Sequence, residues 1–366
     1  MDLFFKLRAR GQAPKALRWE RLKQRYNAHK SCVTELLNIL TKLDVQVRCV
    51  NRVELDRQHL ENVDLVIAVG GDGTVLSAAH FLDHGSIPLL GINSDPNVTI
   101  EDRVVLKKTD ERRSHGALCM CTALDMEEHL IKVLHGGGHI HPLTRIRCNV
   151  KSTFSETLLV PALNDILISN PSPAAVSRFR MGWLEPAQSD DNHVQPPLSQ
   201  EELQQQQQQQ DESSSLLIPK NRLIKNEYGT ITRFGGIPYN VNDSINVWSS
   251  GMWISTSTGS TAAMKAAGGH VMEYNDTSLQ YLIREHMIEQ RYLISLQDEA
   301  KSRGTELKES DINNGMIGTG DKLHIRWNSQ RGRIFIDGSH LTHNLELGDE
   351  ILIDNQAQPL KMFTRN

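Results

Sequence analysis

The spacing of apolar residues changes from helical to strand-like along the first third of the chain. Over residues 14–42 they recur three and four positions apart, which predicts an amphipathic helix. The segment 45–50, VQVRCV, alternates as a half-buried strand does. Two runs, 64–71 and 88–95, are almost continuously apolar, a pattern typical of strands buried on both faces of a parallel sheet. Between those two runs, residues 74–82 are expected to form a helix.

Strand, turn, helix and strand in this order predict an α/β fold. We therefore expect an N-terminal α/β domain with an open parallel sheet over residues 1–140. After a glycine-rich turn at 135–139 the pattern becomes β-rich and predicts a mainly β second domain over 141–366. Whether the extreme C-terminus packs back on the first domain stays open. Residues 187–219 are polar and Gln-rich, and a segment so poor in core-forming side chains is expected to be a disordered loop.

The composition is that of an ordinary globular protein. Of the 366 residues 39% are hydrophobic, and the formal net charge of -4 leaves no general basic surface for nucleic acid. No apolar stretch approaches the roughly 20 residues of a membrane span, so no membrane partner is expected. The five cysteines are odd in number and scattered, which favours a reducing compartment. We expect a cytoplasmic location, with mitochondria or peroxisomes as alternatives, because the basic N-terminus fits a targeting segment or, as we prefer, a surface helix.

The first apolar run breaks into Gly70-Gly71-Asp72-Gly73-Thr74. Glycines allow a close backbone approach, so N–H groups here can point at phosphate oxygens, and Thr74 is expected to cap the following helix. The turn holds no lysine and is not a P-loop, so charge neutralisation must come from elsewhere, most simply from a divalent metal carried by the nucleotide. Asp72 can accept the proton of an attacking hydroxyl, as phosphoryl transfer to an alcohol requires. The alternative is an Asp-Gly turn without a function.

Two further polar groups stand out. Asn164 and Asp165 lie inside an apolar strand pattern, and they are either hydrogen-bonded core residues or ligand contacts. The second group ends a Ser/Thr-rich stretch before a helix of small residues, where hydroxyls and amides suit sugars and phosphates. It consists of Thr258, Gly259, Ser260 and Thr261. The histidines between 135 and 141 are interpreted as solvated, and no metal site is expected in the protein itself.

Taken together, GGDGT (70–74), ALND (162–165) and TGSTAAMKAAGG (258–269) resemble the NAD kinase family. The resemblance extends over residues 60–355 apart from the Gln-rich insert. It is strengthened by GINSDP, RRSHGALCM, NDILISNPSPAAVSRF and IDGSHLTHNLELGDEI. The chain looks most like the plant NADH kinase branch and, less closely, like the mitochondrial NAD kinases.

The resemblance implies phosphorylation of the adenosine-ribose 2′-hydroxyl of NAD(H) to NADP(H), with ATP and Mg²⁺ or another divalent cation. It implies that Asp72 is the base and that the Asn164-Asp165 pair contacts the adenine and ribose of the dinucleotide. The full set of residues implied to bind substrates is Gly71, Gly73, Thr74, Asn93, Asn164, Asp165, Thr258, Gly259, Ser260 and Thr261. Relatives in this family are usually oligomers, so a homodimer is expected.

The chain departs from the usual family pattern at three positions. Ser250 replaces an aspartate, Ser257 a proline and Ala263 a tyrosine that would stack on the dinucleotide. The plant-like branch shares such replacements, which favours NADH as the preferred substrate. Two other functions stay open: an NAD(H)-binding sensor without catalysis, and a diacylglycerol- or sphingosine-type lipid kinase. The lipid kinases share GGDGT but usually continue with an Asn-Glu-Val stretch that is missing here.

Overall fold

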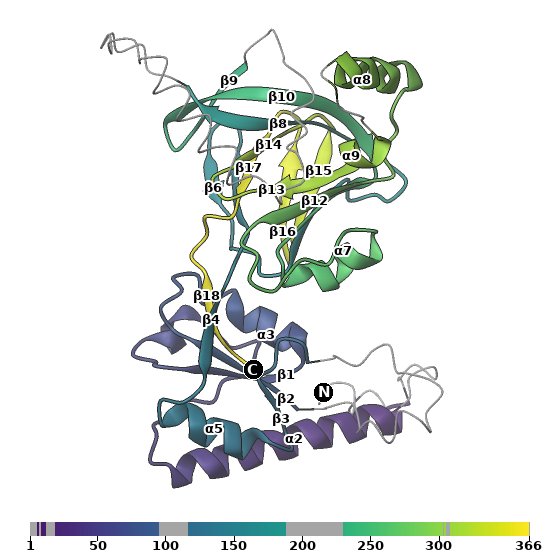
Figure 1. Ribbon diagram of the computed structural model, residues 1–366. Coiled ribbons are helices and arrows are strands. Elements are labelled where there is room, and N and C mark those ends of the chain that lie inside the picture. Colours follow the sequence, from purple (N-terminus) through teal and green to yellow (C-terminus); the bar gives the residue numbers. More distant parts are fainter. Residues whose placement is uncertain are drawn as a thin grey trace, which may run out of the picture. The chain divides into compact units, whose positions relative to one another are not determined.

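The protein forms two compact units in a computed structural model (Figure 1). The described residues are 6, 9–11, 19–94, 116–187, 230–302, 304 and 308–365, so nearly all of the Gln-rich insert lies outside them. Unit 1 consists of two segments of the chain, Met1–Leu143 and Gln358–Asn366. Unit 2 consists of the segment between them, Thr144–Ala357. The fold class expected from the sequence, an α/β part and a mainly β part, is confirmed.

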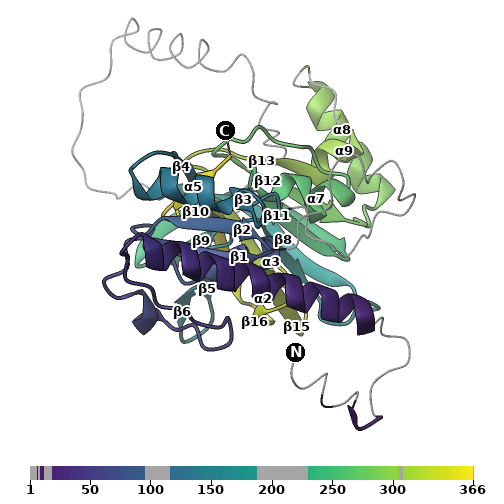
Figure 2. The same cartoon turned by 90° about the horizontal axis from the view of Figure 1, so that it is seen from below.

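Unit 1 consists of helices packed on both faces of one sheet. Its described elements are α2 (Trp19–Lys42), η1 (Arg57–Leu60), β1 (Val66–Gly70), α3 (Asp72–Ala79), β2 (Leu89–Asn93), β3 (Cys121–Thr122), α5 (Met126–Leu134), β4 (His139–Leu143) and β18 (Leu360–Thr364). Helices α2 and α5 lie on one face of the sheet and α3 on the other (Figures 1 and 2).

The sheet of unit 1 is mixed rather than purely parallel. Strand β2 pairs in parallel with β1, with the short β3 and with the C-terminal β18, whereas β4 runs antiparallel to β18 at the edge. The prediction of an open parallel sheet is therefore correct for β1, β2, β3 and β18. It is wrong for β4, which is an antiparallel edge strand. The residues that supply β18 follow β2 by more than 260 positions in the chain.

Helix α2 buries its apolar stripe against this sheet. Cys32, Leu36, Ile39 and Leu40 recur at three- and four-residue steps and join one buried cluster with residues of β2 and α5. The prediction of a strand over 45–50 is wrong, because this segment has no regular secondary structure and pairs with no strand of the described residues. Its Val47 is 46% exposed, so the alternating pattern does not mark a buried face.

Unit 2 is built from two antiparallel sheets. One has the strand order β6-β5-β17-β14-β8-β10-β9 and the other β13-β12-β11-β7-β15-β16. The described elements are β5 (Arg147–Lys151), β6 (Glu156–Leu158), β7 (Asp165–Ser169), β8 (Ser177–Pro186), β9 (Thr230–Phe234), β10 (Ile237–Ser249), β11 (Gly251–Ser255), η2 (Gly259–Thr261), α7 (Ala263–Ala266), β12 (Leu279–Arg284), α8 (Gln290–Ser302), α9 (Glu309–Asn313), β13 (Asn314–Ile317), β14 (Leu323–Trp327), β15 (Arg331–Ile336), β16 (Leu341–Glu346) and β17 (Glu350–Asp354).

The core of unit 2 joins residues from both sheets in one apolar cluster. In the second sheet Ile166 lies opposite Ile254, and both are fully buried in that cluster. Side chains alternate along a strand, so the neighbouring pair Asp165 and Ser255 points to the other face. The ends of β7 and β11 thus carry polar residues on the face away from the core. None of the described helices is long and apolar enough to cross a membrane.

Candidate functional site

The glycine-rich turn connects β1 directly to α3. Gly71 is the N-cap of α3, and the helix begins at Asp72, two residues earlier than expected. Thr74 is therefore not the cap but lies in the first turn, where its N–H donates to the Gly71 carbonyl at 2.8 Å. A Cβ on Gly70 would lie 2.3 Å from Thr74 Oγ1, so this position requires glycine for the turn to close.

Backbone N–H groups hold both carboxylate oxygens of Asp72. Leu118 N donates to Oδ1 at 2.8 Å, and Gly116 N donates to Oδ2 at 3.2 Å. The carboxylate also lies at the positive end of the α3 dipole, which favours a negative charge. Asp72 is half-buried. Its orientation is thus determined by main-chain atoms from a segment more than 40 residues along the chain.

Asn93 lies beside this segment. It pairs with Gly70 at the carboxyl ends of the parallel strands β1 and β2, where open α/β sheets bind their ligands. Gly116 has φ +70, and a Cβ there would lie 2.6 Å from Asn93 Nδ2. The structure therefore brings Asp72 and Asn93 together at the carboxyl ends of these strands. Gly116 lies against both residues, because its N–H donates to Asp72 and its Cα packs against the Asn93 side chain.

The Cys119 thiol lies at this turn and donates to the Gly70 carbonyl oxygen at 3.9 Å. Burial, followed by the charge of Asp72, raises its pKa to about 12, so the thiol stays protonated. All five cysteines of the chain are free. No group of three His, Cys, Asp or Glu side chains with metal-binding geometry occurs among the described residues.

In unit 2 the chain around Asn164 is fixed on two sides. Its carbonyl oxygen accepts hydrogen bonds from Thr256 N at 3.0 Å and from the Thr256 and Ser255 hydroxyls at 3.3 Å. Gly259 packs so closely that a Cβ would lie 2.0 Å from this same oxygen. On the other side, the Asp337 carboxylate accepts the N–H groups of residues 163–165. The structure thus brings Asn164 together with the 256–259 segment.

Two buried polar atoms of this cluster have no hydrogen-bond partner in the described part of the chain. They are Asn164 Oδ1 and Thr258 Oγ1. An unsatisfied buried polar atom costs about 1–3 kcal/mol, and native proteins rarely leave one without a reason. An unpaired amide oxygen and an unpaired hydroxyl fit a ligand that offers amino or hydroxyl hydrogens, such as an adenine amino group or a ribose.

Asp165 follows Asn164 in the chain, begins β7 and is 7% exposed. Burial, and after it the negative charge of Asp337, raises the pKa of its carboxyl to about 7. The group therefore changes its charge near neutral pH. A carboxyl with a perturbed pKa, in the residue that follows an unsatisfied buried amide oxygen, is a feature of binding sites.

The other predicted residues of this segment play different parts. The Ser260 hydroxyl is fully buried, donates to the Ser257 carbonyl at 2.7 Å and accepts Met272 N at 3.0 Å, so it holds the loop together. Thr261 is exposed. The helix expected after it is short, with η2 followed only by the four residues of α7.

Two residues of the candidate sites were not singled out by sequence reasoning. Asp337 and Gly116 lie inside segments that carry the family resemblance, but nothing in their local pattern assigned them a role. The available signal was an Asp-Gly pair between two strands for Asp337. For Gly116 it was a glycine before an apolar residue.

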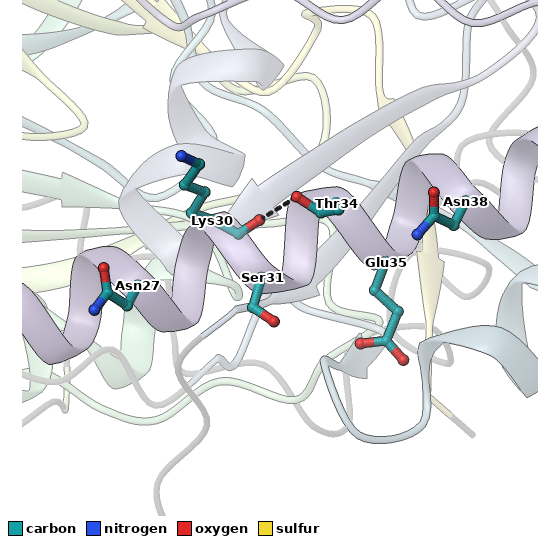
Figure 3. Close-up of a pocket in the computed structure, with 6 residues that line it drawn as sticks. All are labelled: Asn27, Lys30, Ser31, Thr34, Glu35 and Asn38. Carbon is teal, nitrogen blue, oxygen red and sulfur yellow. Dashed lines mark hydrogen bonds between the residues drawn. The ribbon is translucent and has the colours of Figure 1, made fainter.

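A surface hollow of about 430 Å³ lies elsewhere, along α2 (Figure 3). Thr34 Oγ1 donates to the Lys30 carbonyl at 3.0 Å within this helix, as helical threonines often do. The hollow contains none of the predicted site residues. Its lining residues are Asn27, Lys30, Ser31, Thr34, Glu35 and Asn38.

Comparison with protein-family models matches residues 15–97 to the ATP-NAD kinase N-terminal domain. A rice (Oryza sativa subsp. japonica) protein named "Probable NADH kinase" is 32% identical over 350 residues, which cover 96% of this chain and 85% of that protein. This identity over nearly the whole length establishes descent from a common ancestor. The chain belongs to the NAD kinase family.

Two solved structures share the fold. An NAD kinase from Archaeoglobus fulgidus in complex with ATP gives a TM-score of 0.55 at 17% identity, over 91% of this chain and 90% of that one. Yeast NADH kinase complexed with NADH gives a TM-score of 0.53 at 14% identity. The match covers 85% of this chain and 65% of the yeast chain, which is less than two thirds of it.

Proposed function

We propose that this protein transfers the terminal phosphoryl group of ATP to the 2′-hydroxyl of the adenosine ribose of NAD(H), with NADH as the preferred substrate. The observation that carries this proposal is the geometry of Asp72. Its carboxylate is oriented by two backbone N–H groups at the end of a buried strand, next to a glycine turn without a lysine. Membership of the NAD kinase family supports the same reaction.

In this mechanism Asp72 accepts the proton of the 2′-hydroxyl as the oxygen attacks the γ-phosphorus of ATP. A bond forms between the 2′-oxygen and phosphorus, and the bond to the β–γ bridging oxygen breaks. ADP leaves with that electron pair, and Asp72 later returns its proton to solvent. Gly71 and Gly73 would approach the phosphates with their backbone N–H groups, because the turn offers no side-chain cation and the Thr74 N–H already donates to the Gly71 carbonyl.

A divalent ion, Mg²⁺ in the simplest case, would neutralise the phosphates of ATP. The described residues fit an ion that arrives with the nucleotide better than one held by a protein cage. They contain no cluster of metal-binding side chains, and both oxygens of Asp72 already accept backbone N–H groups.

The dinucleotide would be held by the polar cluster of unit 2. Asn164 Oδ1 and Thr258 Oγ1 offer unsatisfied atoms, and Asp165 offers a carboxylate for ribose hydroxyls. Ala263 stands where the usual family pattern has a tyrosine, and Ser250, where it has an aspartate, is exposed. The loss of a negative charge and of an aromatic ring supports a preference for the neutral dihydronicotinamide form over the cationic one.

Two broader features complete the proposal. We expect a homodimer in the cytoplasm, with mitochondria or peroxisomes as the other possible locations. The five free thiols support a reducing compartment.

The first test offers the purified protein NAD⁺ and NADH in parallel, with ATP and magnesium, and follows NADP⁺ and NADPH with a coupled dehydrogenase. Faster NADPH formation is the expected result. Faster NADP⁺ formation would support the proposed kinase activity and contradict the proposed preference for NADH. If NADH binds and neither product forms, the protein is a sensor without catalysis.

Asp72→Asn should lower kcat by about 10²–10⁴-fold, the usual contribution of a general base, with little change in the far-UV circular dichroism spectrum. Asp56→Asn is a matched control, because this Asp of unit 1 also accepts a backbone N–H, from Arg57 at 2.6 Å, but caps a surface turn. A nearly normal kcat in Asp72→Asn would show that Asp72 is not the general base.

A further inference from the structure

Asp337 stands out because one carboxylate accepts three successive backbone N–H groups. Leu163 N donates to Oδ2 at 2.8 Å, while Asn164 N and Asp165 N donate to Oδ1 at 2.7 and 3.0 Å. The N–H of Asp337 in turn donates to the Asp165 carbonyl at 2.9 Å. The residue lies in the turn between β15 and β16 with φ +48, a conformation that L-residues rarely adopt.

These bonds determine how the chain enters β7. The N–H groups of a strand's first residues usually pair with a neighbouring strand, but at residues 163–165 a side chain takes that place. From the opposite side Thr256 N holds the Asn164 carbonyl, and Gly259 packs against it. The backbone of Asn164 is thus clamped between the turn of Asp337 and the 256–259 segment. The directions of the Asn164 and Asp165 side chains follow from that clamp.

We propose that Asp337 is a positioning residue for dinucleotide binding, which orients the Asn164-Asp165 pair through the backbone. This inference rests on the proposed function of that pair. The three donors explain why the residue is an aspartate. Both oxygens of a carboxylate accept hydrogen bonds, whereas an asparagine would turn an NH₂ group toward Leu163 N.

The same geometry couples Asp337 to the charge of Asp165. Burial, and after it the negative charge of Asp337, raises the pKa of the Asp165 carboxyl to about 7. Of the neighbouring described elements, β11 places Ser255 opposite Asp165, and the 256–261 segment contains no titratable side chain. Asp337 is therefore the charged group that acts on Asp165 from the elements packed around it.

The sign of the pH effect follows from this coupling. Below pH 7 Asp165 takes up a proton and loses an acceptor for ribose hydroxyls, so NADH affinity should fall as the pH drops through about 7. Removal of the Asp337 charge lowers the pKa of Asp165. The midpoint of this loss should then move to lower pH.

The experiment measures NADH affinity of the full-length chain by fluorescence between about pH 5.5 and 8.5, together with KM for each substrate. The variant is Asp337→Asn. The control is Asp349→Asn, at the opposite end of β16, where the carboxylate of a buried residue, 7% exposed, accepts Glu346 N at 2.8 Å. Circular dichroism and thermal unfolding of each variant establish that it is folded.

Asp337→Asn should raise KM for the dinucleotide about 10-fold or more, as expected when a hydrogen bond to a charged group is lost. KM for ATP should stay within about twofold, and the pH midpoint of NADH binding should fall. Asp349→Asn should retain wild-type affinity and midpoint. A folded Asp337→Asn protein with the wild-type KM and midpoint would overturn the inference.

Two further outcomes also test whether Asp337 is a positioning residue. If Asp337→Asn raises KM equally at every pH, its role is only structural and the inference fails. If Asp337→Asn does not fold, Asp337→Glu replaces it, because a carboxylate on a longer side chain retains the charge while it displaces residues 163–165. That variant should weaken NADH binding and keep the midpoint near 7. Wild-type protein that neither binds NADH nor forms NADP(H) would refute the proposed function itself.

Discussion

Gly73 offers a test of phosphate binding that should leave the fold unchanged. A Cβ at this position would meet no atom within 4 Å, and its φ lies outside the left-handed region, in contrast to Gly70 in the same turn. Gly73→Ala should therefore leave the fold intact and raise the stability of α3 by about 0.5–1 kcal/mol, since alanine is the better helix residue.

The same substitution places a methyl group where the phosphates of ATP would approach the backbone. We expect KM for ATP to rise at least several-fold and KM for NADH to stay unchanged. The measurement is a pair of steady-state titrations beside a thermal unfolding curve. A stable Gly73→Ala enzyme with the wild-type KM for ATP would mean that phosphate does not bind near Gly73.

Candidate site residues could be found from the sequence only when they interrupt a pattern. Asp72 does so as a carboxylate among glycines, and Asn164-Asp165 as polar residues in an apolar strand. Asp337 does not, because an Asp-Gly pair between strands is ordinary turn chemistry. Its contacts with residues 163–165 span more than 170 positions, and only the folded chain brings them together.

At the scale of elements, the C-terminal strand β18 completes the sheet of unit 1. Phe363 is 7% exposed and belongs to the same apolar cluster as α2 and α5, whereas Lys361 in the same strand is exposed. Phe363→Ala should lower the free energy of unfolding of unit 1 by about 3 kcal/mol, the usual cost of removing a buried aromatic ring. Lys361→Ala should change it by less than about 0.5 kcal/mol.

The pair of variants is compared by chemical denaturation. Equal stability of Phe363→Ala and Lys361→Ala would show that β18 is not part of the core of unit 1 in solution. The Arg365–Asp125 ion pair is a second attachment of the C-terminal segment, but it is solvent-exposed and contributes little by comparison.

Elements were predictable from the sequence where burial leaves an unambiguous pattern. Strands β1 and β2 are continuous apolar runs because both of their faces are covered by helices. The 45–50 segment alternates as well, and its Val45 packs against the core of unit 1, but it pairs with no strand in the described chain. The place of β18 was beyond local patterns, because its partners β2 and β4 lie far away in the chain.

At the scale of the whole molecule, two separate apolar cores predict two unfolding transitions. One core belongs to unit 1 and the other to unit 2, so each should melt as its own cooperative element in calorimetry. Phe363→Ala should lower one transition temperature and leave the other unchanged, which assigns the first to unit 1.

This assignment makes it possible to locate the dinucleotide contacts without any measurement of turnover. Asn164, Asp165, Thr258 and Asp337 all belong to unit 2, so NADH should raise the transition that Phe363→Ala leaves unchanged. A ligand at a hundred times its dissociation constant stabilises its binding unit by about 2.7 kcal/mol. Calorimetric scans at increasing NADH concentration test this, and Asp337→Asn should reduce the shift at any given concentration. A shift confined to the transition sensitive to Phe363→Ala would place the main dinucleotide contacts in unit 1 and contradict the assignment of the Asn164-Asp165 pair.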